Sequence, residues 1–594
     1  MTFHLPTNGI FRRVAAWCAA PAAAGAGLVC AALSGCARPA GAPPEPCLRR
    51  ADAAVPSLDP AQAASIAAGR AVALCYETPL QFDYASRPYA LAPYACDLPD
   101  VSPDGLEITL RLRDDVWFGP ADCFDTPDKR RKAVAGDLVY SLKRLADAKN
   151  SSPGFWILDG KVEGVAEFRA ASLDPDVPTD YARGISGIRA LDDRTVRIRL
   201  VKPSSEFLWT LALPYASLVP REAVERHGQE GFGAVEAGSG PFRLADWRRG
   251  HRMVFARREG RDGARDRTPV LPGAGDAVPY ASVEILAMSD PSTRWLSFLS
   301  GAFDLAENIS RDDWETVVGP DGSLLPDMAA RGVSLHSGPA LETTYLAFNM
   351  DDPVVGGTNA ALRRALSCAF DSAAWVSLNR GRVISAGGPL PPGVAGRLET
   401  PPPYGHDEAR ARALLAEAGY PGGVDPKTGR RLALSLLLGG TDPATRESAE
   451  LMASFFARVG VSLSLEYDAF PQFLRRLNRR EAQTFLVTWV ADDPDPANFL
   501  QLFVSRNASP GPNRCNFSSP RYDALFDLAE TSPEGSSARA DAVAEMQEIV
   551  RSECPWIFVG HRRDAVLAGP RLRNYLLHAF PLGMEKHWRA APRP

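Results

Sequence analysis

The sequence contains little histidine and cysteine, and neither occurs at a spacing that metal binding or nucleophilic catalysis requires. Among 594 residues there are 8 histidines and 10 cysteines. No CxxC pair, HExxH motif or GxSxG motif is present, which argues against the common zinc sites and the serine-hydrolase elbow. We therefore expect a protein that is not an enzyme and that uses neither a metal nor a cofactor. A hydrolase whose catalytic residues lie far apart in the sequence is the weaker alternative.

Charge of one sign is not in excess either, and long hydrophobic runs are scarce. The chain has 66 Lys+Arg against 71 Asp+Glu, a net charge of −5, with 45% hydrophobic and 23% charged residues. Without a basic excess, a nucleic-acid partner is not expected. Beyond the N-terminal region no uninterrupted run of about 18 apolar residues occurs, so the body of the chain carries no predicted membrane span.

The N-terminus is typical of an exported protein. A short basic start leads into an alanine-rich apolar run at residues 14–29, which is short for a membrane span. The following Leu33-Ser34-Gly35-Cys36 resembles a lipobox, the bacterial lipoprotein signal, in which cleavage precedes the cysteine and lipid is attached to it. The resemblance implies a signal peptide at 1–35, a lipid-anchored flexible tether at 36–47, and a periplasmic or cell-envelope location. An ordinary signal peptide with an incidental cysteine is the alternative.

Seven cysteines lie beyond Cys36, and the number is odd. An oxidising compartment permits disulfides, and an odd count leaves at least one thiol without a partner. Cys96 and Cys123 are expected on loops that flank a pair of strands. We therefore predict that a disulfide, if one forms, joins Cys96 to Cys123.

Strand and helix patterns alternate along the body of the chain. Residues 107–113 alternate apolar and charged side chains, as in a half-exposed strand, whereas residues 484–490 form a continuous apolar strand that we expect to be buried on both faces. Residues 407–419 are typical of a helix that begins at an aspartate cap and ends at a glycine. This alternation predicts an α/β fold, and the length predicts more than one lobe.

Seven segments in a fixed order resemble the oligopeptide- and dipeptide-binding family, the solute-binding proteins of peptide and nickel ABC importers. The segments are SLDP at 57–60, YETPL at 76–80, SPDGLEITLRLRDDVWF at 102–118, AGDLVYSLKR at 135–144, IRALDDRTVRIRL at 188–200, GSGPFRL at 238–244 and LAFNM at 346–350. Together with the helix at 407–419 they extend over most of the chain. The resemblance implies the two-lobed periplasmic-binding-protein fold of type II with an inserted accessory domain.

By the same resemblance the domains are discontinuous. Lobe I takes residues 48–83, 203–342 and 567–594, because the family's chain passes between the lobes more than once. The accessory domain takes residues 84–202, and lobe II takes residues 343–566. One stretch, residues 119–132, is an insertion that departs from the family pattern, and its four basic residues at 129–132 are interpreted as a solvated loop.

The candidate site follows the strand at 484–490, which ends in the acidic turn that begins with Asp492. By resemblance, Asp492 takes the α-ammonium of an extended peptide ligand, and Trp489 forms a wall of a side-chain pocket. Val490 and Ala491 offer main-chain groups to the ligand. The alternatives are a core position for Trp489 and a plain turn with a helix cap, and we expect Asp493 and Asp495 to do the capping.

Two further residues are candidate ligand contacts. Glu77 lies where a lobe I strand is expected to reach the cleft. Tyr345 lies at the start of the first strand of lobe II, where a packed aromatic is the stronger alternative.

The resemblance predicts a monomeric, lipid-anchored solute-binding component of an ABC importer. It captures peptides or peptide-like ligands between two closing lobes, and its partners are the ligand, the permease subunits and the membrane. One alternative is a non-peptide ligand in the same fold, such as a nickel chelate, a sugar or another small solute. Another is a lipoprotein that serves interaction or sensing rather than transport.

Overall fold

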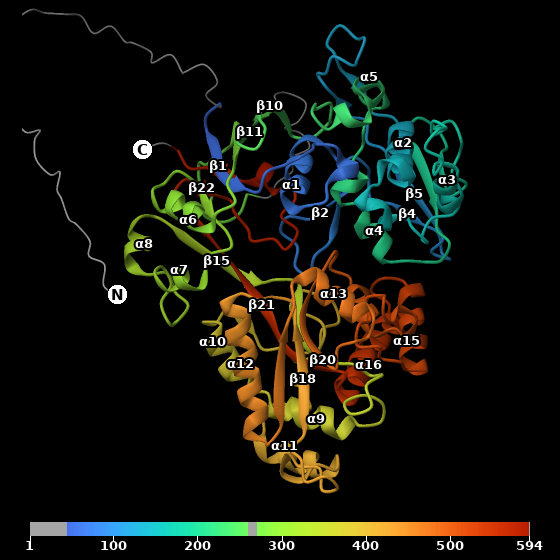
Figure 1. Ribbon diagram of the computed structural model, residues 1–594. Coiled ribbons are helices and arrows are strands. Elements are labelled where there is room, and N and C mark those ends of the chain that lie inside the picture. Colours follow the sequence, from blue (N-terminus) through green and yellow to red (C-terminus); the bar gives the residue numbers. More distant parts are fainter. Residues whose placement is uncertain (1–43, 259–269, 593–594) are drawn as a thin grey trace, which may run out of the picture. The chain divides into compact units, whose positions relative to one another are not determined.

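The computed structural model describes residues 44–258 and 270–592. Within these ranges no helix is long and apolar enough to cross a bilayer. The predicted signal peptide and Cys36 lie outside the described residues. The described chain is a mixed α/β protein with strands in several sheets (Figure 1), as the alternating sequence pattern predicts.

The residues predicted to form lobe I contain a four-stranded sheet with the order β1-β13-β11-β10. β1 lies parallel to β13, and β11 lies antiparallel to both of its neighbours. A smaller three-stranded sheet has the order β12-β23-β22. The elements here are β1 (Cys47–Asp52), α1 (Ile66–Cys75), β10 (Phe242–Arg248), β11 (Arg252–Arg257), β12 (Val278–Pro279), β13 (Ser282–Ala287), α6 (Pro291–Leu299), α7 (Arg311–Glu315), α8 (Pro326–Ala330), β22 (Leu572–Arg573) and β23 (Arg589–Ala590).

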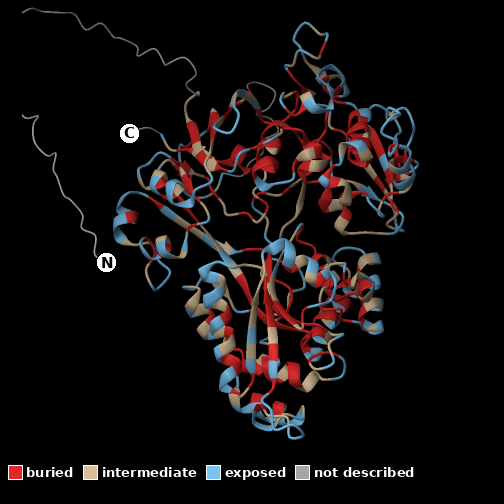
Figure 2. Cartoon of the chain, in the orientation of Figure 1, coloured by how far each residue is buried: buried red, intermediate tan, exposed pale blue. Residues whose placement is uncertain are grey.

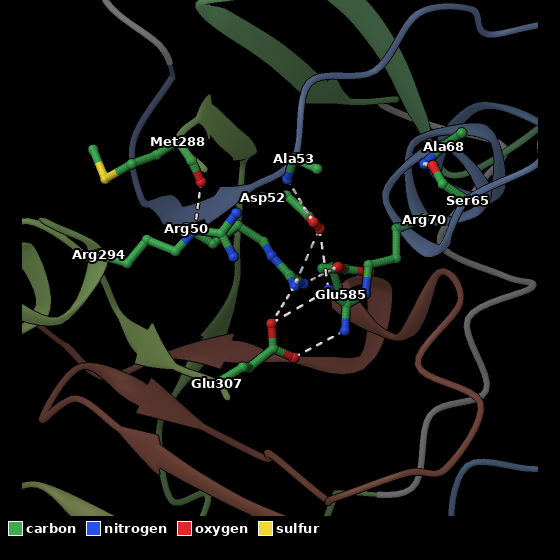
Figure 3. Close-up of polar contacts among 10 residues, drawn as sticks. All are labelled: Arg50, Asp52, Ala53, Ser65, Ala68, Arg70, Met288, Arg294, Glu307 and Glu585. Atoms are coloured by element: carbon green, nitrogen blue, oxygen red, sulfur yellow. Dashed lines mark hydrogen bonds and ion pairs between the residues drawn. The ribbon is translucent and has the colours of Figure 1, made fainter. Parts of the chain in front are cut away.

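A buried ionic cluster joins distant segments of lobe I (Figure 3). Arg50 of β1 lies 2.6 Å from Glu585, near the C-terminus, and 2.6 Å from Glu307. Arg70 of α1 lies 2.9 Å from Glu307 and 3.1 Å from Asp52. Two guanidinium groups thus hold three carboxylates together, and the cluster fixes the end of the chain against its first strand.

Residues 84–202, the predicted accessory domain, contain an antiparallel sheet with the order β4-β5-β9-β8, against which α2 packs. The half-exposed strand predicted at 107–113 is confirmed as β5, because its side chains alternate between buried and accessible. The elements of this stretch are β4 (Asp100–Val101), β5 (Glu107–Arg111), β6 (Trp117–Phe118), β7 (Arg131–Lys132), α2 (Ala135–Ala146), α3 (Val165–Ala171), β8 (Ile188–Ala190) and β9 (Thr195–Arg199). The short strand β2 (Leu80–Phe82) precedes residues 84–202, its partner β3 (Leu91–Pro93) lies at their start, and α4 (Glu206–Thr210) and α5 (Arg221–Phe232) follow them.

Lobe II contains most of an eight-stranded sheet whose main order is β14-β21-β16-β20-β18-β19. The long strand β21 pairs with β16 through its first half and with β14 and β15, which belong to the predicted lobe I, through its second half. The strands are β14 (Leu305–Ala306), β15 (Ser334–Pro339), β16 (Glu342–Phe348), β17 (Val383–Ile384), β18 (Ala433–Leu438), β19 (Ser462–Tyr467), β20 (Thr484–Val490) and β21 (Trp556–Ala568).

Helices cover both faces of this sheet (Figures 1 and 2). Leu346 and Phe348 share one hydrophobic core with α9, α11 and α12, whereas Tyr345 and Ala347 point into the other core with α15 and α16. The helices are α9 (Ala360–Ala369), α10 (Ser372–Leu378), α11 (Glu408–Glu417), α12 (Pro443–Arg458), α13 (Phe470–Asn478), α14 (Pro496–Leu500), α15 (Pro520–Thr531) and α16 (Ser537–Glu553). The predicted helix at 407–419 is confirmed: Asp407 caps α11, and Gly419 takes the left-handed conformation beyond its end.

The predicted disulfide is not formed, because Cys96 and Cys123 are both free thiols in the structure, as are the other five cysteines of the described residues. Cys96 is buried, and its main chain forms an isolated antiparallel β-bridge with Leu112. Cys123 lies half-buried in the 119–132 insertion, which the β6–β7 hairpin holds close to α5. There Arg131 lies 2.7 Å from Glu222 of α5, so the loop turns toward this helix.

Candidate functional site

Three parallel strands of the eight-stranded sheet end at one edge. β18 lies parallel to β19 and to β20, so their carboxyl ends come together. In open α/β sheets ligands bind outside the carboxyl ends of the strands. An aspartate follows each strand here: Asp442 after β18, Asp468 after β19 and Asp492 after β20. Of these three, Asp492 is the one predicted from the sequence to contact a ligand.

Two of the three carboxylates are already engaged within the fold. Asp442 caps α12 by accepting hydrogen bonds from the amide and hydroxyl of Thr445, at 3.0 and 2.6 Å. Asp468 lies 3.2 Å from the guanidinium of Arg476. Asp492 has no hydrogen bond or ion pair to any residue that the structure describes, and its side chain is exposed. It is therefore the carboxylate of this edge that is available to a ligand.

Residues distant in sequence set the electrostatics of Asp492. Surrounding protein excludes part of the water and raises the pKa of Asp492, and the charge of Glu206 raises it further, while Lys161 lowers it. A side chain on the wall of a cleft combines these two properties, because it is open to solvent on one side and desolvated by protein on the other. Lys161 is committed to Glu206 at 3.3 Å, so it neutralises Asp492 incompletely. A cation that enters beside Asp492 would relieve this unfavourable environment.

The strand that leads to Asp492 leaves one side of its main chain open. β20 pairs with β16 along its whole length, but with β18 only as far as Leu486. The expectation of burial on both faces is therefore wrong for the second half of β20, where Val490 is 61% exposed. Because main-chain groups alternate in direction along a strand, the N–H and C=O of Thr488 and Val490 point away from β16. The amide of Ala491 points the other way and bonds to Leu341 at 2.9 Å.

A hydrogen-bonded network holds the turn after Asp492. The indole of Trp489 donates to Asn498 at 2.9 Å, and the Asn498 amide donates to Asp493 at 3.0 Å. Asp493 accepts from the main chain of Asp495 at 2.9 Å, and burial raises its pKa well above the usual range. Trp489 is only partly buried, so it is fixed by Asn498 and still reaches the surface of the site.

Of the two residues expected to cap the next helix, Asp495 does so, whereas Asp493 accepts a hydrogen bond from the main chain of Asp495. Asp495 caps α14 through the amide of Ala497 at 2.8 Å, and both of its carboxylate oxygens accept from Nη2 of Arg539 at 2.7 Å. Ser205, which precedes α4, donates to Asp495 at 2.9 Å. This polar contact joins the segment that leaves the accessory domain to lobe II. A cavity of about 200 Å³ lies beside it, lined by Tyr89, Trp209 and the prolines on either side of Asp495, among others.

Tyr345 and Glu77 do not lie at this edge. Tyr345 is 2% exposed and stacks on Trp556 with ring centroids 3.4 Å apart, so it is a core residue of the sheet. Glu77 is 2% exposed, and its carbonyl accepts a hydrogen bond from the amide of Leu218. The prediction of both as ligand contacts is corrected, because packing covers the face from which each side chain projects.

Sequence reasoning missed the residues that face Asp492. Lys161, Glu206 and Tyr215 lie within electrostatic range of Asp492. Burial of Tyr215 raises its pKa, and the charge of Asp492 raises it further. Lys161 also lies over the ring of Trp156 at 5.0 Å. No local signal marks these residues, because they precede Asp492 by some 280 to 330 positions and only the fold brings them near.

The edge offers a carboxylate and main-chain groups to a ligand. Among the described residues, no group of three or more His, Cys, Asp or Glu side chains is placed to hold a metal ion. A free carboxylate next to an unpaired main-chain edge can hold a cationic group together with an extended backbone. Such an arrangement suits a ligand that carries both.

Comparison with known proteins identifies the family and the fold. The family model for the middle region of bacterial extracellular solute-binding proteins, family 5, matches residues 88–511. Heme-binding protein A of Haemophilus influenzae is 25% identical over 81% of this chain and 81% of its own length. Di/tripeptide-binding protein 2 of Pseudomonas aeruginosa is 27% identical over 78% and 79%, respectively. The structure of HbpA2 from Haemophilus parasuis matches 92% of this chain and 100% of that chain, with a TM-score of 0.75 at 22% identity, and confirms the two-lobed fold.

Proposed function

This chain belongs to the bacterial extracellular solute-binding proteins of family 5, and on that premise we propose that it captures a peptide or peptide-like ligand beside Asp492 and delivers it to an ABC importer. The observation that carries the proposal is the pairing of a free carboxylate with an open strand edge. Relatives with di/tripeptide-binding names support the class of ligand. Family membership supports the role in uptake.

The ligand binds as an additional strand. Its α-ammonium meets Asp492, and its main chain pairs with the outward N–H and C=O groups of Thr488 and Val490. Main-chain pairing does not depend on side-chain identity, so the strand supplies affinity for many sequences. Trp489, fixed by Asn498, forms one wall for a ligand side chain. Lys161, Glu206 and Tyr215 approach from the other side and enclose the ammonium end.

Closure of the two lobes around the ligand is the functional step. The ligand shifts the open–closed equilibrium because it touches both sides only in the closed state. The domain boundaries proposed for this motion are 48–83, 203–342 and 567–594 for lobe I, 84–202 for the accessory domain and 343–566 for lobe II. The protein acts as a monomer that Cys36 anchors to the membrane through lipid, and permease subunits receive its ligand.

Calorimetry tests the role of Asp492. Short peptides are titrated into the leaderless protein and into Asp492→Asn, with Asp468→Asn as a matched control at the neighbouring strand end. Loss of a charged hydrogen bond costs about 1.5–3 kcal/mol, so Asp492→Asn should bind roughly ten- to a hundredfold more weakly. Asp468→Asn should bind as the unaltered protein does.

N-acetylated versions of the same peptides complete the test. They lack the ammonium and should bind weakly to the unaltered protein, with no further loss in Asp492→Asn. Equal affinity of Asp492→Asn and the unaltered protein for the free peptides would remove Asp492 from the site. Binding of no peptide by either form would favour an interaction or sensing lipoprotein.

A further inference from the structure

A second hollow lies on the accessory domain, apart from the strand edge that carries Asp492. It is a groove of about 660 Å³ between α2, the strand β7 and the first turns of α5. It shares no lining residue with the cavity beside Asp495. One wall comes from the end of the 119–132 insertion, the stretch that departs from the family pattern. Its volume lies in the range of small-molecule sites, roughly 300–1,000 Å³.

Most charges around this groove neutralise one another. Arg131 lies 2.7 Å from both Asp137 and Glu222, so the interpretation of this basic residue as part of a solvated loop is wrong. Arg221 pairs with Glu225 at 2.6 Å. The ammonium of Lys132 lies over the ring of Trp117, 5.7 Å from its centroid. One further cation lines the groove, and none of these contacts involves it.

That cation is Lys143, on the inner side of α2. The residue is 8% exposed, yet its ammonium makes one hydrogen bond among the described residues, at 2.9 Å to the carbonyl of Tyr181. An ammonium has three donors, and a buried one without an anion is unfavourable. Burial lowers the pKa of Lys143. The charge of Asp180 opposes this shift, and the charge of Arg221 adds to it to a smaller extent than Asp180 opposes it. No carboxylate of the described residues lies within ion-pair distance of it.

Aromatic surface lies next to this ammonium. The rings of Tyr140 and Tyr181 have centroids 5.1 Å apart and are tilted by 44°. Both residues line the groove together with Lys143. The groove therefore offers one incompletely satisfied cation beside two aromatic rings.

We propose that this groove binds a small carboxylate that carries an aromatic ring. The carboxylate accepts hydrogen bonds from Lys143, and the ring lies against Tyr140 and Tyr181. The ligand supplies the anion that the protein itself does not place beside Lys143. This site is separate from peptide capture, so either can be present without the other.

Saturation-transfer NMR with 3-phenylpropionate as the probe tests the proposal on the leaderless protein. The unaltered protein should give a saturable signal, and Lys143→Met should weaken binding roughly tenfold or more, because a charged hydrogen bond is lost. Lys132→Met, a matched change at the other lysine of the groove, should leave the affinity unchanged. The neutral amide 3-phenylpropanamide should bind much more weakly than the acid.

The controls separate this site from the cleft. Asp492→Asn should bind 3-phenylpropionate as the unaltered protein does, and Lys143→Met should keep its affinity for short peptides. Lys143→Gln serves as a second variant if Lys143→Met does not fold, which circular dichroism reveals. The absence of saturable binding, equal binding of acid and amide, or unchanged binding by the Lys143 variant would each overturn the proposal.

Discussion

The buried cluster of lobe I predicts a large and asymmetric response to mutation. The side chains of Arg50 and Glu585 are 1% and 0% exposed and lie 2.6 Å apart. Burial raises the pKa of Glu585 even though Arg50 opposes the shift, so this carboxylate depends on its partner. Arg50→Met would leave Glu585 without that partner. Removing one member of a buried pair costs about 3–5 kcal/mol, and we expect a loss of that size in the free energy of unfolding.

A double-mutant cycle refines this prediction. Arg50→Met combined with Glu585→Leu should cost less than Arg50→Met alone, because the second change removes the uncompensated carboxylate. Arg49→Met on the same strand is the control. Arg49 is partly exposed and pairs with Glu45 and Glu284, so its loss should cost at most about 1 kcal/mol.

Urea denaturation followed by tryptophan fluorescence measures these differences as shifts of the transition midpoint. A cost below about 1 kcal/mol for Arg50→Met would refute the reasoning, since it would mean that water or rearrangement compensates the buried carboxylate. Additive costs in the double mutant would refute it as well. In that case the two side chains would contribute independently of each other.

Three further predictions concern other parts of the chain. Asn498→Ala removes the hydrogen bonds to the indole of Trp489 and to the carboxylate of Asp493. Peptide affinity measured by calorimetry should therefore fall severalfold although Asp492 itself is unchanged. Burial lowers the pKa of His561 to about 4, so the unfolded state binds the proton more readily below pH 6.5. Stability should therefore fall by up to about 3 kcal/mol between pH 6.5 and 4, and His561→Gln should flatten that part of the denaturation profile. Cys36→Ser should move the protein from the membrane fraction to the soluble fraction on cell fractionation.

Local patterns predicted what depends on neighbours in sequence. The apolar run at 484–490 and the acid after it gave the position of the strand and of Asp492, because a strand and the turn that ends it are local features. The helix at 407–419 was predicted with its caps for the same reason. The family resemblance supplied the two-lobed fold, which no single pattern in the chain could provide.

The errors concern which surfaces are covered. Alternation places Tyr345 and Leu346 on opposite faces of β16, but both faces carry helices, so neither side chain is open to a ligand. The exposure of Val490 depends on β18 ending at Leu438, a length that β20 itself does not encode. Lys161 and Glu206 reach Asp492 only through the fold. Sequence patterns specify the periodicity and the ends of helices and strands. Which distant residues face each other depends on the tertiary fold.

The state of the cysteines has a practical consequence for handling the protein. Six of the seven described cysteines are buried, and desolvation raises the pKa of each, for instance to about 11 in Cys47 and Cys515 and about 12 in Cys96 and Cys554. Such thiols stay protonated and react slowly with maleimides. Burial raises the pKa of Cys123 as well, but this thiol is only half-buried, and it lies in the insertion whose far end borders the groove of Lys143. Among the cysteines of the described residues, a maleimide dye should therefore react first at Cys123, which lies on the insertion that borders the groove.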